Sequence, residues 1–145
     1  MATPVVLPDG KKIAIDLLSA ALDGVLVTSE LPEGAAFTAA LPVVRVLRIG
    51  GVADARGWSD PASRDNPRFS VDCYAPAADV DAAMQLALRV CAEWELLPGQ
   101  ATADGIVTGI SQETGPQDRP EEPNTGVTRI GMTLGMSVCP PRVTS

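Results

Sequence analysis

Apolar residues recur at helical spacing in two segments of the chain. The first runs from Asp9 to Gly24, residues that suit a helix N-cap and a helix end. The second begins near Asp79 and Asp81, whose carboxylates favour the positive end of a helix dipole. Its apolar arc spans roughly 200 degrees, more than one sheet face needs. We therefore expect the second helix to contact the first helix or another subunit as well.

Five other segments have the alternation or the β-branched composition of strands. In the last of them one face is apolar, and the other carries Gly131 and Gly135 among small polar residues. Glycine weakens a strand unless something approaches closely, so we expect a neighbour against this face. The pattern predicts an α+β domain with two main helices and a mixed or mostly antiparallel sheet of about five strands. The predicted strands are 25–31, 43–49, 68–74, 105–112 and 127–138.

Two long polar segments without periodicity, near 50–66 and 113–127, are predicted loops. Loops of this length are functional or lack a fixed structure, and the sequence leaves both possibilities open. A large aromatic side chain in a polar loop has little reason to be there unless it packs on something. Arg56, Trp58 and Asp60 are therefore the candidate partner contacts in the first loop.

Length and composition favour one domain over 1–145, since 145 residues with 46% hydrophobic residues can bury a single core. We expect no membrane-spanning segment, because no apolar run approaches the roughly 20 residues required, and the N-terminus lacks signal-peptide features. A net charge of −7 disfavours specific nucleic-acid binding. Cys73, Cys91 and Cys139 fit neither a disulfide framework nor a paired metal motif, so we expect free thiols.

The search for catalytic motifs argues against an enzyme. The chain has no histidine, nucleophile elbow, P-loop or dinucleotide fingerprint. Asp79 and Asp81 are better explained by the helix dipole than as paired catalytic carboxylates. We predict no catalytic residue, no metal site and no cofactor.

The order of the predicted elements, together with three sequence segments, resembles the tail terminator proteins of long-tailed phages, particularly those of actinobacteria. The segments are LPVVRVLRIGG (41–51), NPRFSVDCYA leading into ALRVCAEW (66–94), and GPQDRPEEPNTGVTRIGMTLGMSV (115–138). The resemblance covers nearly the whole chain and rests on a pattern of elements, not on a catalytic signature.

The resemblance implies a homo-hexameric ring at the neck-proximal end of the virion tail, assembled in the cytoplasm of the host bacterium. Such a ring ends tube polymerisation and joins the tail to the head. Its partners are the other copies, the tail tube protein and a head-tail connector or stopper protein, while DNA passes through the lumen without specific binding.

In such a ring, Asp118, Glu121 and Glu122 of the second loop are candidate lumen-facing carboxylates, which repel phosphate. The alternative is that they only keep a surface loop soluble. Other interpretations also stay open for the whole chain: another neck or head-tail connector protein, a monomeric α+β binding module, or, more remotely, a hydrolase of unusual design.

Overall fold

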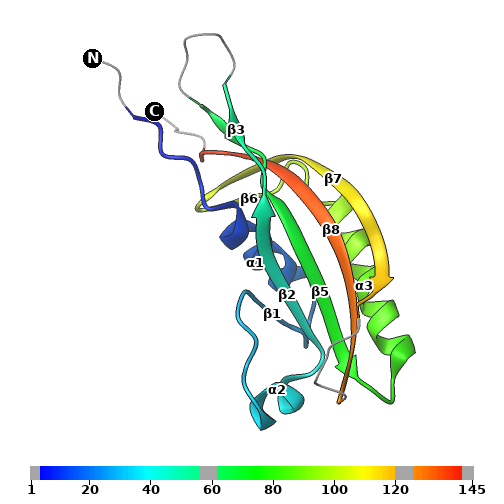
Figure 1. Cartoon of the computed structure of the whole chain (residues 1–145). Coiled ribbons are helices and arrows are strands. Elements are labelled where there is room, and N and C mark those ends of the chain that lie inside the picture. The colour runs from blue at the N-terminus through cyan, green and yellow to red at the C-terminus, as the bar shows by residue number, and fades with distance from the viewer. Residues whose placement is uncertain (1–3, 56–61, 120–125, 142–145) are drawn as a thin grey trace.

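The computed structural model describes residues 4–55, 62–119 and 126–141, and within these ranges three helices pack with one curved, mostly antiparallel sheet (Figure 1). The elements in chain order are α1 (Gly10–Ala21), β1 (Leu26–Thr28), α2 (Ala35–Ala40), β2 (Val43–Gly50), β3 (Ala53–Asp54), β4 (Arg64–Asp65), β5 (Arg68–Pro76), α3 (Val80–Glu95), β6 (Ala101–Thr102), β7 (Gly105–Asp118) and β8 (Val127–Cys139).

The long strands lie in the order β1, β2, β5, β8, β7, and the short β6 pairs with the start of β7. Only the β1–β2 pair is parallel; every other pair in the described ranges is antiparallel. The predicted α+β class with a mostly antiparallel sheet is therefore confirmed. The five predicted strands correspond to β1, β2, β5, β7 and β8, while α2 and the two-residue strands β3, β4 and β6 were not predicted.

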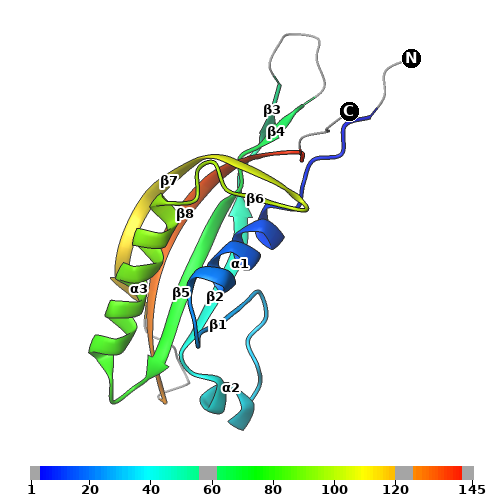
Figure 2. The ribbon, with the colours of Figure 1, turned by 180° about the vertical axis from the view of Figure 1, so that it is seen from behind.

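Both long helices cover the same face of the sheet (Figure 2). The predicted N-cap of α1 is confirmed, since the Asp9 side chain accepts from the Lys12 N–H. Asp79 was expected in the first turn of the second helix; it is instead the N-cap of α3, and its side chain accepts from the Ala82 N–H. Trp94 of α3 is fully buried, and its indole N–H donates to the Gly135 carbonyl at 2.9 Å. This bond satisfies the polar atom of a large core side chain and fixes α3 against β8.

The wide apolar arc of α3 is only partly covered. Ala83, Ala87, Val90 and Trp94 are buried against the sheet. Arg89 donates to the Ala21 carbonyl at the end of α1, which ties the two helices together. Leu88 on α3 is still 50% exposed, and Leu96, which caps its C-terminal end, is 64% exposed.

The opposite sheet face is covered over part of its length by α2, whose Phe37 packs edge-on against Tyr74 of β5 with ring centroids 5.3 Å apart. The neighbour expected against Gly131 and Gly135 belongs to the chain itself. A Cβ at Gly131 would collide with the Arg119 side chain, and one at Gly135 with Ser111. Both glycines thus make room for side chains of β7 or the residue after it.

The two predicted loops are shorter than expected. Strands β3 and β4 pair at the base of 50–66, and β7 continues to Asp118 before β8 begins at Val127. Two-residue strands are too short to show alternation, and the polar half of β7 pairs only on its β8 side. Both features therefore look like loop in the sequence.

Candidate functional site

The hairpin stem formed by β3 and β4 projects beyond the sheet at one end of the molecule (Figure 1). The Arg64 guanidinium donates to both carboxylate oxygens of Asp54, with Nε–Oδ1 at 2.9 Å and Nη2–Oδ2 at 2.6 Å. The Ser63 N–H donates to the Asp54 carbonyl at 2.9 Å. These contacts are exposed, so they orient the stem more than they stabilise the fold.

The stem is anchored at its base by Asp65, a carboxylate that is only 6% exposed. Arg48 of β2 holds both of its oxygens, at 2.5 and 2.9 Å, and also donates to the Gly50 carbonyl. The Asn66 N–H completes the set at 3.0 Å from Asp65 Oδ1. The hydrogen bond to Asp65 raises the pKa of Arg48. A bidentate pair at this depth fixes the direction in which the hairpin leaves the sheet.

The predicted partner contacts Arg56, Trp58 and Asp60 fall within 56–61, outside the described residues. The structure describes the stem on either side of them, up to Ala55 after β3 and from Ala62 before β4. Their role as partner contacts stays a prediction.

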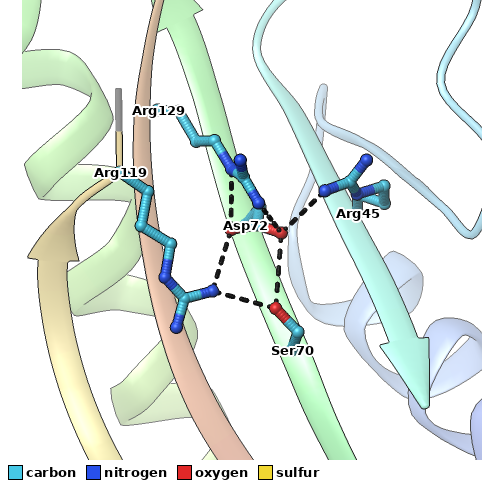
Figure 3. A network of polar contacts seen from close by, with 5 residues as sticks. All are labelled: Arg45, Ser70, Asp72, Arg119 and Arg129. Atoms are coloured by element: carbon cyan, nitrogen blue, oxygen red, sulfur yellow. Dashed lines mark hydrogen bonds and ion pairs between the residues drawn. The ribbon is translucent and has the colours of Figure 1, made fainter. Parts of the chain in front are cut away.

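A second anchor lies near the other end of the sheet, around Asp72 of β5 (Figure 3). This carboxylate is fully buried, yet it lies on the sheet face that α1 and α3 do not cover, the face it shares with Tyr74. Arg45 donates to Oδ2 at 3.0 Å, Arg119 to Oδ1 at 3.2 Å, and Arg129 to Oδ1 at 3.0 Å and Oδ2 at 3.1 Å. Arg119 also donates to Ser70 Oγ at 2.9 Å.

Strand register explains how the three arginines meet. Arg45 on β2, Asp72 on β5 and Gly131 on β8 are direct neighbours across the sheet. Because Gly131 has no side chain, Arg119 can cross β8 to reach the carboxylate from the far side. Burial raises the pKa of Asp72, but the hydrogen bonds from Arg129 and Arg45 lower it by more, so the net shift is downward.

The Asp72 network holds both ends of the β7–β8 connection. Arg119 follows the last residue of β7, and Arg129 is the third residue of β8. Of the predicted lumen residues, Asp118 is exposed at the end of β7. Glu121 and Glu122 lie outside the described residues, so only one of the three carboxylates is placed.

Each of the two anchors is built around a buried aspartate. Among the described residues, Asp65 and Asp72 are the buried charged side chains, and each sits at the base of one predicted loop. Strand β8 links them, since Val138 pairs with Asp65 and Gly131 with Asp72. At about 3.3 Å per residue, the two points lie about 23 Å apart along β8. The two connections therefore leave the sheet at opposite ends.

Sequence reasoning missed both anchors, although a signal was present. Arg45 and Asp72 are charged residues inside otherwise apolar strand segments, and buried charges are nearly always paired. The alternation alone did not say which strands are neighbours, so the partners could not be matched.

Cys73 is buried and Cys91 is half-buried. Burial raises the pKa values of Cys73 and Cys91, which keeps these thiols protonated. Over 4–55, 62–119 and 126–141, no three potential ligands are grouped to hold a metal ion. Nor does any helix in these ranges have the length and apolar character to cross a membrane. What the two anchors do is hold the described strand ends at the bases of the two connections.

Comparison with known proteins gives a likeness in fold. No protein-family model matches the sequence, and no curated protein matches it either. Among solved structures, the chain is similar to a chain of the "Virion of native gene transfer agent (GTA) particle". The TM-score is 0.54 at 18% identity, with 88% of this chain and 84% of that chain covered.

Proposed function

We propose that this protein is a structural virion subunit that forms a ring on the end of a phage tail tube, ends tube polymerisation and joins the tail to the head connector. Three observations support the proposal: the sequence resemblance to tail terminators, the fold likeness to a chain of a gene transfer agent virion, and the two anchored connections. The last of these carries the argument.

A ring between a tube and a connector has a different neighbour on each side, so its subunit needs two separate contact regions along the ring axis. The hairpin stem and the β7–β8 connection meet this need, because they leave the sheet at opposite ends (Figure 1). Their buried ion pairs hold the described base of each connection in place before binding, which lowers the ordering cost of association. One end meets the tail tube protein and the other the connector or stopper.

A closed ring also needs two different lateral surfaces, since its contacts are head-to-tail. Apart from the N-terminal residues before α1, the exposed large apolar side chains of the described residues lie on two separate parts of the molecule. Leu26, Ile49 and Val52 are 40%, 51% and 75% exposed on β1, on β2 and just after β2, while Leu88 and Leu96 lie on and just after α3. We assign the contact between neighbouring copies of the hexamer to these two surfaces.

The lumen assignment is part of the same proposal. Asp118, Glu121 and Glu122, repeated by the ring symmetry, form an acidic band that lets DNA pass without being held. The virion is the site of action, and assembly takes place in the host cytoplasm.

Two measurements test the function. The purified protein is sized by light scattering, and electron microscopy follows tail tubes assembled with and without it. We expect rings, and tubes capped at one end that no longer grow. The variant Leu88→Asp/Leu96→Asp loses the rings, whereas Gln85→Asp, an exposed change on the same helix, keeps them.

A stable monomer that never caps tubes would contradict the proposal and favour a monomeric binding module. Rings that bind the head side and ignore tubes would instead favour another neck or connector protein. The fold likeness to a virion chain is compatible with that second function.

A further inference from the structure

The N-terminal arm, residues 4–7 with the sequence PVVL, runs away from the body before α1 (Figure 1). Val6 is 84% exposed and Val5 43% exposed, so neither is buried in its own chain. Pro4 and Pro8 restrict the backbone around them to extended conformations. The arm is thus an extended apolar segment whose valines have no place in the core.

The arm leaves from a fixed base. Asp9 caps α1, and Pro8 lies against Gly105, where an added Cβ would be 3.0 Å from the Pro8 Cβ. This base sets the direction of the arm, which points to the same end of the molecule as the hairpin stem in both views (Figures 1 and 2).

A groove of about 430 Å³ opens beside the hairpin stem, where β5, β7 and β8 meet the turn after β2. Near it the β7–β8 register shifts between Val107 and Gly109, so the ladder is interrupted there. The lining is mainly apolar side chains and glycine. At Gly109 an added Cβ would meet nothing within 4 Å, so another backbone can approach closely there. The lining includes Val52, Pro67, Ile110, Met136, Gly109 and Gly135.

We propose that this groove receives the N-terminal arm of a neighbouring copy in the ring. The arm and the groove match in chemistry, because the side chains of residues 1–8 carry no charge and the groove is largely apolar. They also match in position, since both lie at the hairpin end of the subunit. Burying Val5 and Val6 in a neighbour removes apolar surface that the single chain leaves in water. The proposal rests on the ring of the proposed function and adds an exchange of arms to it.

Disulfide trapping tests the contact. Val6→Cys is introduced in one batch of full-length protein and Val52→Cys in another, because both side chains are exposed and their replacement does not disturb the core. After mixing and mild oxidation, we expect a cross-linked dimer that neither batch gives alone. A chain with both changes should give a ladder of multimers on a non-reducing gel. The matched control pairs Val6→Cys with Gln85→Cys, an exposed position on α3 outside the assigned contact surfaces, and should not cross-link.

A second variant lacks residues 2–6 and keeps Leu7, Pro8 and the Asp9 cap. We expect an unchanged thermal midpoint for the single chain and a ring dissociation constant raised by about tenfold or more. Any of three results would overturn the inference: no specific cross-link, a cross-link only within one chain, or rings that keep their affinity without the arm. If the unmodified protein forms no ring at all, the proposed function fails first. If rings form but show neither the cross-link nor the raised dissociation constant, the arm exchange is wrong and the proposed function is not affected.

Discussion

Arg119 crosses β8 directly over Gly131 and donates to Asp72. A Cβ at position 131 would collide with the Arg119 side chain and block this path. The contact joins the end of β7 to the centre of the sheet, two strands away. It also gives the glycine in this strand an explanation within the chain. We expect the end of β7 to depend on this crossing.

Gly131→Ala should destabilise the protein by displacing Arg119 from Asp72 and Ser70. We expect a loss of about 1.5 kcal/mol in the free energy of unfolding, measured by urea denaturation, since hydrogen bonds to charged groups are of this size. In the Arg119→Ala background the same change should cost nothing or be stabilising, because alanine is otherwise better than glycine in a strand.

Gly115→Ala is the matched control for that cycle. It lies on the same sheet, in β7, and an added Cβ meets no atom within 4 Å. Additive effects of Gly131→Ala and Arg119→Ala would show that the two residues do not interact.

Asp72→Asn should remove a pH-dependent part of the stability. The folded-state pKa of Asp72 lies below its ordinary value of 3.8. The ionised carboxylate therefore contributes stability that is present above that value and is lost as the pH falls through the folded pKa. We expect the wild type to lose more stability than Asp72→Asn between pH 5 and pH 3, as measured by urea midpoints.

At neutral pH, Asp72→Ala should cost about 3 to 5 kcal/mol, because three partly buried guanidinium groups lose their shared carboxylate. Parallel pH profiles for the wild type and Asp72→Asn would contradict the assigned role of the ionised form.

The hairpin should carry partner binding without carrying the fold. Replacing 56–61 by a Gly/Ser tract of equal length keeps the Arg64–Asp54 and Arg48–Asp65 pairs, so we expect stability within about 0.5 kcal/mol of the wild type. Co-sedimentation with tail tubes should be lost. Trp58→Ala should weaken it and Trp58→Phe should largely preserve it. Undiminished tube binding by the Gly/Ser variant would refute Arg56, Trp58 and Asp60 as contacts.

The fold class could be predicted from the sequence because five strands and two helices show clear periodicity. The cap at Asp9 was equally readable, since capping is local, whereas Asp79 was expected in the first turn and is the N-cap of α3. The hairpin stem and the Asp72 network were not readable. Each depends on which strands become neighbours, and Arg119 reaches Asp72 from 47 residues away in sequence. Local patterns carry no information on such pairs.

The proposed acidic band in the lumen predicts an effect of charge reversal. We expect Asp118→Lys/Glu121→Lys/Glu122→Lys rings to retain DNA and to slow genome ejection, because lysine side chains in the lumen attract the passing phosphates. The effect requires these charges to lie within a Debye length of about 8 Å of the DNA. The neutral variant Asp118→Asn/Glu121→Gln/Glu122→Gln controls for the loss of negative charge alone. Normal ejection and no retained DNA in the lysine variant would place this connection outside the channel.

The central claim is a ring subunit that holds one partner at each end. It is tested most directly by electron microscopy of tail tubes assembled with the purified protein, at a resolution that shows ring and subunit orientation. The account predicts one ring per tube at a single end, with the hairpin stem and the β7–β8 connection on opposite faces of the ring. Tubes that grow unchanged, or a ring in which both connections face the same side, would contradict it.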